Sequence, residues 1–133
     1  MIHLVVGPPC GGKSTHVSQH AQPGDLVVDW DDIAIRLGSP RSHLHAQPLL
    51  PLVAAEYDRL LELARDWPAD VWIVRGLPDQ AERAQWVARF NAQLVVCTAP
   101  RAVLLERAAA RSKTRLTIWS IDRWLARAAG DRP

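Results

Sequence analysis

One short segment near the start of the chain has residue types and spacing suited to binding a phosphate. It reads Gly7-Pro8-Pro9-Cys10-Gly11-Gly12-Lys13-Ser14 and fits the pattern G-x-x-x-x-G-K-[ST]. Small or absent side chains let such a loop wrap a phosphate and direct backbone N–H groups at it. Lys13 would add a cation for the β- and γ-phosphates, and Ser14 a hydroxyl for Mg²⁺. With the adjoining Thr15, the segment predicts binding of ATP or another nucleoside triphosphate together with Mg²⁺.

Three carboxylates follow the apolar run Leu26-Val27-Val28, at Asp29, Asp31 and Asp32. Near a phosphate-binding loop, a carboxylate can accept the proton of an attacking hydroxyl, or hold the metal or its water. Clustered carboxylates repel one another, so at least one is expected next to a cation or a hydrogen-bond donor. Asp31 and Asp32 could instead cap the short helix that follows. The two interpretations are compatible, because a cap and a base can be neighbouring residues.

Basic residues crowd the last third of the chain: Arg101, Arg107, Arg111, Lys113, Arg115, Arg123 and Arg127. Arg107, Arg111 and Arg115 are spaced four apart, so a helix would place them on one stripe. A solvated helix face is the ordinary explanation of such a stripe. Here the segment from Arg111 to Arg115 also lies between two expected helices. Such a hinge could close over ATP and bring an arginine to the transferring phosphoryl group.

Strands alternating with helices are expected to position these residues. Strands are predicted at 1–6, 26–28, 71–74 and 94–97. Helices are predicted at 14–21, 31–37, 49–67, 79–90, 100–111 and 117–129, the last capped by Gly130. This order predicts an α/β fold with right-handed crossovers and a parallel sheet. The nearly continuous apolar strands predict helices on both faces. Ligands would then bind at the carboxyl ends of the strands.

Size and composition describe an ordinary globular chain. Its 133 residues fit one domain, 1–133, with 48% apolar and 23% charged residues. A net charge of +2 is too small to indicate nucleic-acid binding by itself. No apolar run approaches the length of a membrane span, and Met1 leads directly into the first strand. We therefore expect a cytoplasmic protein with reduced cysteines and no membrane partner.

Three segments together resemble the small P-loop kinases. They are the loop, the strand end Val28-Asp29-Trp30-Asp31-Asp32-Ile33, and the helix Leu104-Leu105-Glu106-Arg107-Ala108-Ala109-Ala110-Arg111. The pattern is most similar to the kinase domain of phage polynucleotide 5′-kinases, and more loosely to zeta-toxin and adenylate-kinase-type phosphotransferases. The resemblance implies a three-layer P-loop NTPase fold with about four parallel strands. It implies phosphate and Mg²⁺ binding by Lys13 and Ser14, and a general base at Asp31. Arg111 would be the lid arginine on the donor phosphates, with Arg107 supporting it.

Two positions depart from that pattern. The family often has an arginine soon after the Asp pair, where this chain has Ala34, with Arg36 two residues later. Many relatives carry an Asp after the third strand, where this chain has Arg75. A second acidic partner for Mg²⁺ is therefore missing on that strand, and Asp29 is the candidate substitute.

The acceptor is left open by these residues. The acceptor hydroxyl could belong to the 5′ end of a single-stranded nucleic acid, to a nucleoside or to a modified base. The first alternative function is that of a nucleoside or nucleoside-monophosphate kinase. A nucleotide-gated binding protein with little or no catalysis is the second. Weaker candidates for acceptor contacts are Asp32, Arg36, Arg75, His43 and His45. Trp30 could stack on a base or pack its helix, whereas Trp72, Trp86, Trp119 and Trp124 are predicted to belong to the core.

Overall fold

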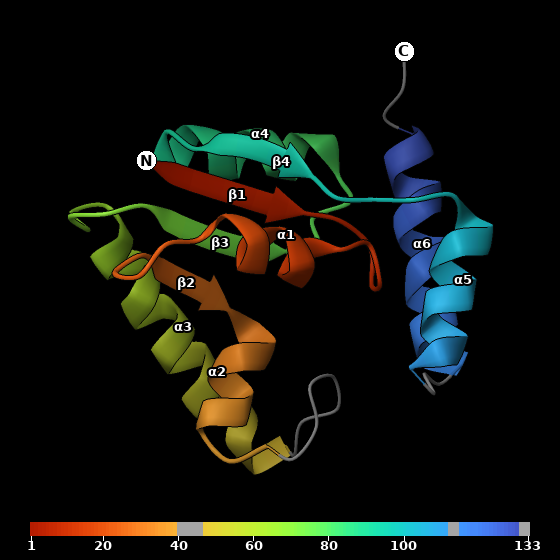
Figure 1. The fold of residues 1–133 in the computed structure, drawn as a ribbon, viewed down its shortest axis with the longest axis horizontal. Coiled ribbons are helices and arrows are strands. Elements are labelled where there is room, and N and C mark those ends of the chain that lie inside the picture. The colour runs from red at the N-terminus through yellow and green to blue at the C-terminus, as the bar shows by residue number, and fades with distance from the viewer. Residues whose placement is uncertain (40–46, 112–114, 131–133) are drawn as a thin grey trace.

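Four parallel strands form one sheet in the order β2-β3-β1-β4 (Figure 1). In this computed structural model the described residues are 1–39, 47–111 and 115–130, so the candidates His43 and His45 lie outside them. The strands are β1 (Ile2–Val6), β2 (Leu26–Asp29), β3 (Val71–Arg75) and β4 (Gln93–Val96). Val6, the last residue of β1, is paired with Arg75 on one side and Val96 on the other. The predicted parallel α/β sheet of a P-loop NTPase-like fold is confirmed.

Helices cover both faces of the sheet. They are α1 (Lys13–His20), α2 (Trp30–Arg36), α3 (Leu50–Ala64), α4 (Gln80–Phe90), α5 (Arg101–Ala110) and α6 (Arg115–Gly130), with a 3-10 turn η1 (Gln47–Leu49) before α3. On one face α1 places Val17 against Val5 and Trp72. On the other face, residues of α3 and α4, such as Leu61 and Phe90, form the larger core with the strands. Helices α5 and α6 pack on each other beyond the carboxyl ends of the strands (Figure 1).

Local sequence explains where several helices begin and end. The side chain of Asp29 accepts a 3.0 Å hydrogen bond from the N–H of Asp31 and caps α2. Asp79 does the same for α4 through the N–H of Ala81, at 2.9 Å. Asn91 adopts the left-handed conformation that ends α4. Pro51 lies in the first turn of α3, where a missing N–H costs nothing.

Three expectations need correction. The third helix, α3, ends at Ala64 and not at Trp67. The indole N–H of Trp67 donates a 2.9 Å hydrogen bond to the carbonyl oxygen of Gly24, in the segment before β2. Helix α6 begins at Arg115 and includes Gly130 instead of ending before it. Strand β4 is not covered on both faces, since Leu94 and Val96 are 43% and 46% exposed. As the edge strand it has a neighbour on one side only.

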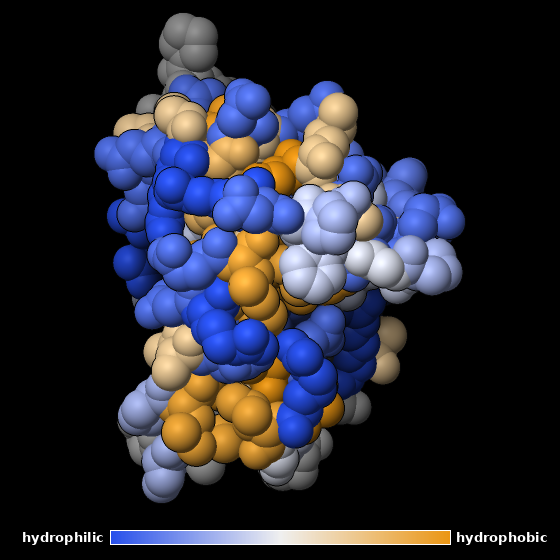
Figure 2. Space-filling view, turned by 90° about the vertical axis from the view of Figure 1, so that its left-hand side faces the viewer, coloured by the Kyte–Doolittle hydropathy of each residue, from blue (hydrophilic) through white to orange (hydrophobic). Residues whose placement is uncertain are grey.

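Apolar side chains also gather on the face that carries α2 and α3. Figure 2 shows them at the lower end of the molecule, and the exposed apolar residues of this region include Ile35, Leu37 and Leu52.

None of the helices formed by the described residues is long and apolar enough to span a membrane.

Candidate functional site

Glycines give the loop between β1 and α1 its shape. A Cβ atom added to Gly7 would lie 1.9 Å from the carbonyl oxygen of Cys97, and one added to Gly11 would lie 2.5 Å from the same atom. Both positions therefore require glycine, because the loop passes so close to the end of β4. Gly12 has φ 96°, and Cys10 has φ 63°, a left-handed conformation that non-glycine residues seldom adopt. The loop thus has the compact, wrapped backbone that the motif predicts.

Lys13 lies across the mouth of this loop. Its ammonium donates hydrogen bonds to the carbonyl oxygens of Gly7, at 2.7 Å, and Pro8, at 2.8 Å. Burial lowers the pKa of Lys13, and the charges of Asp29 and Asp31 act in the opposite direction. Lys13 is half-buried, and carbonyl oxygens are its only hydrogen-bond partners among the described residues, so its ammonium is suited to attract a phosphate anion.

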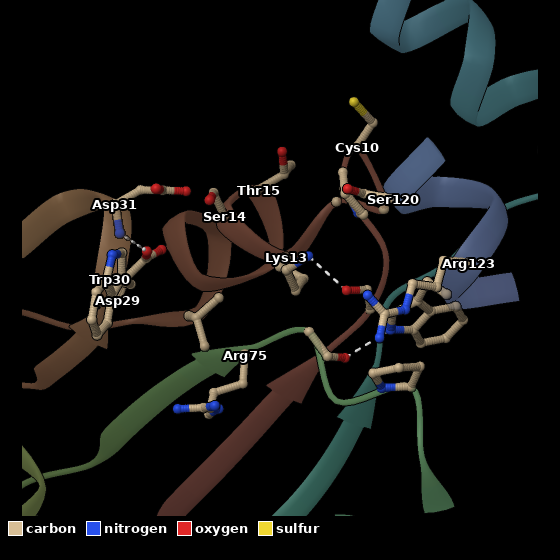
Figure 3. A pocket seen from close by; sticks show the side chains of 18 of the residues that line it. Cys10, Lys13, Ser14, Thr15, Asp29, Trp30, Asp31, Arg75, Ser120 and Arg123 are labelled. Carbon is tan, nitrogen blue, oxygen red and sulfur yellow. Dashed lines mark hydrogen bonds between the residues drawn. The ribbon is translucent and has the colours of Figure 1, made fainter. Parts of the chain in front are cut away.

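The loop forms the centre of a pocket of about 570 Å³. Residues of four other segments complete its walls. They are Asp29, Trp30 and Asp31; Val74, Arg75, Gly76 and Pro78; Arg111; and Trp119, Ser120, Arg123, Trp124 and Arg127 of α6. Figure 3 shows Lys13 between two groups of side chains, with Asp29, Trp30, Asp31 and Arg75 on one side and Ser120 and Arg123 on the other. Thr15 lines the pocket, whereas Pro8 does not.

The three carboxylates after β2 have different environments. Asp29 is 8% exposed, and burial, followed by the charge of Asp32, raises its pKa to about 6. Asp31 is half-buried and lines the pocket, while Asp32 is exposed and does not line it. One residue of this group, Asp29, caps α2, and another, Asp31, lines the pocket.

The three arginines spaced four apart, Arg107, Arg111 and Arg115, have different surroundings. Arg111 follows the last residue of α5 and lines the pocket. Arg107 donates a 3.0 Å hydrogen bond to the carbonyl oxygen of Cys10 and so braces the loop. Arg115 begins a separate helix and does not line the pocket. The expected break between two helices is present, because α5 ends at Ala110 and α6 begins at Arg115.

Arg75 and Arg36, the two arginines that depart from the family pattern, point to different places. The guanidinium of Arg75 lies 4.5 Å from the ring centroid of Trp86 and 5.6 Å from that of Tyr57. Arg36 is exposed in the last turn of α2 and does not line the pocket. A hydrogen bond from Arg59 lowers the pKa of Glu56 in α3, and the charge of Arg36 acts in the same direction.

One wall of the pocket was missed by the sequence reasoning. Helix α6 supplies Trp119, Ser120, Arg123, Trp124 and Arg127. Trp119 is 55% exposed, so its predicted place in the core is wrong. The opposite side of α6 is buried through Ile121, which packs with Leu104 of α5 and turns Trp119 outward. Trp119, Arg123 and Arg127 are spaced four apart, and this spacing could have revealed the wall.

The donor set at this site suits Mg²⁺. Among the described residues there is no cluster of three or more His, Cys, Asp or Glu side chains that could hold a metal ion by itself. Mg²⁺ is usually held by one or two carboxylates together with substrate phosphates and water. The Ser14 hydroxyl and the carboxylates of Asp29 and Asp31 line the pocket and match that requirement.

The chain belongs to the AAA domain family AAA_33, whose model matches residues 2–130. A chain of the Pnkp1/Rnl/Hen1 RNA repair complex has a similar structure, with a TM-score of 0.74 and 15% sequence identity. The similarity covers 97% of this chain but 44% of that one, so this chain spans less than half of its length. The tunicamycin resistance protein of Deinococcus radiodurans is also similar, with a TM-score of 0.58, 18% identity, and coverage of 98% and 80%. No curated protein matches the sequence. Together these findings define a P-loop kinase-like fold.

Proposed function

We propose that residues 1–133 form one kinase domain that moves the γ-phosphate of ATP or another nucleoside triphosphate to a hydroxyl group. One observation carries the proposal. One pocket contains both the phosphate-binding loop and Asp31, a half-buried carboxylate in the first turn of α2. A binding loop alone is shared by motors, switches and kinases, whereas a pocket carboxylate opposite the loop provides a base for an acceptor hydroxyl.

Each wall of the pocket then has a task. The loop, Lys13 and Thr15 hold the donor phosphates, and Arg111 with Arg107 supports them from α5. Ser14 and Asp29 would hold Mg²⁺, which would neutralise part of the phosphate charge. Asp31 accepts the proton of the acceptor hydroxyl as its oxygen bonds to the γ-phosphorus. The bond from that phosphorus to the β-phosphate oxygen breaks, and the nucleoside diphosphate leaves.

A nucleic acid with a free 5′-hydroxyl is the acceptor that we propose to test first. The structural neighbour in an RNA repair complex supports this choice. So do the aromatic residues Trp30 and Trp119 on the pocket wall, since bases of single strands stack on such side chains. We expect the protein to act in the cytoplasm, where ATP and Mg²⁺ are supplied.

Transfer from γ-labelled ATP to a panel of acceptors tests the proposal. The panel contains 5′-hydroxyl oligonucleotides, nucleosides and nucleoside monophosphates. We expect label on the oligonucleotides, loss of transfer in Lys13→Ala, and retained ATP binding with lost transfer in Asp31→Asn. Label confined to monophosphates or nucleosides would identify the small-molecule alternative. Near-normal turnover by Asp31→Asn would show that the base is another residue.

A binding protein without catalysis is the second candidate. The observation that favours it is Arg75, which occupies the position where an acidic Mg²⁺ partner was expected. If ATP remains intact after long incubation with Mg²⁺ and the whole panel, this candidate replaces the kinase.

A further inference from the structure

We infer that two histidines of α1, His16 and His20, form a binding site for a divalent transition metal ion of the Ni²⁺ and Cu²⁺ type. The pair would supply two imidazole nitrogens, and water would complete the coordination. Neither histidine lines the pocket, so this site is separate from the proposed Mg²⁺ site and does not depend on the proposed function.

The spacing of the two histidines suits chelation. They lie four residues apart in α1, so the helix places them on one face, one turn from each other. The centroids of their rings are 4.1 Å apart. Two histidines at this spacing on a helix are a known arrangement of metal ligands. The pair therefore offers one ion two nitrogen ligands from a single, regular element.

A hydrogen bond fixes the position of the proton on the His20 ring. Nδ1 of His20 lies 2.7 Å from the carbonyl oxygen of His16. Because a carbonyl oxygen can only accept, Nδ1 carries the hydrogen, and in the neutral ring Nε2 keeps its lone pair. A metal-binding histidine commonly donates its other N–H to a backbone carbonyl in this way. His20 is thus held in the tautomer that presents Nε2 to a metal.

The ring of His16 is the one that has to turn. The two rings are stacked, with an angle of 22° between their planes, and the lone pairs of stacked rings do not meet at one point. The side chain of His16 makes no hydrogen bond to a described residue, and it is half-buried. The terminal torsion of a histidine side chain is broad and costs little to change. A turn of His16 about that torsion would direct one of its nitrogens toward Nε2 of the exposed His20.

Trp72 and His3 pack beside the pair. The ring centroid of Trp72 lies 5.9 Å from that of His16 and 6.3 Å from that of His20. His3 stacks on Trp72 at 3.9 Å, and its Nε2 lies 3.0 Å from a carboxylate oxygen of Asp70. His3 is therefore engaged at the start of the sheet, and we do not count it as a ligand. Two protein ligands agree with the absence, among the described residues, of a cluster of three that could hold a metal.

The ligand type determines the class of metal. Mg²⁺ and Ca²⁺ prefer oxygen ligands, whereas imidazole nitrogen suits the later first-row transition metals. Structural zinc sites have four protein ligands and catalytic zinc sites have three. Two nitrogens completed by water fit the tetragonal coordination of Cu²⁺ or Ni²⁺ better. The site would thus take an ion of a different class from the one proposed at Ser14.

An ion at this site would stabilise the helix that follows the phosphate-binding loop. Helix α1 has only eight residues, and no side chain caps its start. Helices this short are marginal by themselves. The N–H of His16 donates a 2.9 Å hydrogen bond to the carbonyl oxygen of Gly12, the last loop residue before α1. The unfolded chain does not hold the two rings together, so an ion that bridges them favours the folded state.

The test titrates Ni²⁺ into protein without a polyhistidine tag, at about pH 7.5, where ordinary histidines are mostly neutral. Ni²⁺ is the probe because Cu²⁺ can oxidise free cysteines, and Cys10 and Cys97 are free. His16→Gln and His20→Gln each remove one proposed ligand. The matched controls change the other histidines of the chain, in His3→Gln and in the double variant His43→Gln/His45→Gln. Thermal unfolding without metal checks that each variant is folded.

We expect the wild type and both controls to bind one Ni²⁺ ion per chain by calorimetry. His16→Gln and His20→Gln should each bind it about tenfold more weakly or worse, because one of two chelating ligands is lost. Saturating Ni²⁺ should raise the midpoint temperature of unfolding of the wild type and the controls, but not of these two variants. An excess of Mg²⁺ should leave Ni²⁺ binding unchanged.

Failure of the wild type to bind Ni²⁺ overturns the inference. So does unchanged affinity in His16→Gln or His20→Gln, which would show that the pair only packs α1. Binding that is lost in either control and retained in the α1 variants would assign the ion to other histidines. Displacement of Ni²⁺ by Mg²⁺ would place the ion in the pocket. None of these outcomes decides whether the protein transfers phosphate, because the two histidines lie outside the pocket.

Discussion

The indole N–H of Trp124 donates a 2.8 Å hydrogen bond to the carbonyl oxygen of Gly76. The same oxygen accepts the N–H of Gly7 at 3.3 Å, so the first glycine of the loop, the end of β3 and helix α6 meet at one atom. Arg83 stacks over Trp124 at 5.3 Å and donates to the carbonyl of Leu77, which has φ 40°. Helix α6, the wall of the pocket that sequence reasoning missed, is thus linked to the phosphate-binding loop through the carbonyl group of Gly76.

Removing this bond should loosen the wall. Trp124→Phe keeps most of the apolar volume but leaves the carbonyl with its longer hydrogen bond only. We expect a loss of about 1 kcal/mol in the free energy of unfolding, the typical net worth of one hydrogen bond, together with weaker nucleotide binding. Urea unfolding and nucleotide titration measure both effects. Trp119→Phe, an exposed residue on the same helix, should leave the free energy of unfolding unchanged. Equal stabilities of the two variants would contradict the anchoring role.

Gly7→Ala should disrupt the loop. Its Cβ would lie 1.9 Å from the carbonyl oxygen of Cys97, so the loop or the end of β4 would have to move. We expect a destabilisation of about 1–3 kcal/mol, as for other overpacked sites, and loss of nucleotide binding. Gly76→Ala is the matched control, since a Cβ there meets no atom within 4 Å. Denaturant unfolding should separate the two variants, and similar stabilities would show that the loop has room to adjust.

Much of this arrangement could be predicted from sequence. Strands β1 to β4 and the loop depend on local patterns, namely apolar runs, glycines and turn residues, and these were placed within a few residues. The surroundings of Trp119 and Arg75 could not be predicted in the same way. Which side of α6 is buried depends on Ile121 packing against α5, and the aromatic rings around Arg75 come from α3 and α4, distant in sequence. Tertiary packing decides both.

Asp29→Asn should make the protein more stable at neutral pH. The pKa of Asp29 is raised from 3.8 to about 6, so its contribution to stability is present at low pH and is lost as the pH rises from about 4 through 6. Asparagine keeps the helix cap without the buried charge. We expect a gain of about 2 kcal/mol at pH 7 in the absence of nucleotide, fading below pH 4. Urea unfolding at both pH values measures it, and a less stable variant at pH 7 would contradict the burial cost. Mg²⁺ binding should become weaker at the same time, because the variant lacks the Asp29 carboxylate.

Three histidines, two in α1 and one in β1, should make the fold sensitive to mild acid. The rings of His16 and His20 stack at 4.1 Å, and His3 stacks on Trp72 at 3.9 Å. Burial, followed by the charges of His20 and His3, lowers the pKa of His16 below 6.5. The stability that His16 contributes is therefore complete above pH 6.5 and is lost as the pH falls below that value. Thermal unfolding at pH 7.5 and 5.5 should show a smaller difference between the two midpoint temperatures for His16→Gln than for the wild type. An unchanged difference would assign the acid response to other groups.

Arg123 should contribute to nucleotide binding, although sequence reasoning gave it no role. Its guanidinium lies 5.1 Å from the ring of Trp119, and both residues line the pocket. Figure 3 shows Arg123 on the side of Lys13 opposite Asp31. If the donor phosphates lie at the loop, Arg123 is placed to add a charge-assisted contact. Arg123→Gln should then raise the KM for ATP on the order of tenfold while leaving the KM for the acceptor unchanged. Arg115→Gln, an exposed arginine of the same helix that does not line the pocket, is the control. A rise in the acceptor KM alone would instead assign this wall of the pocket to the acceptor.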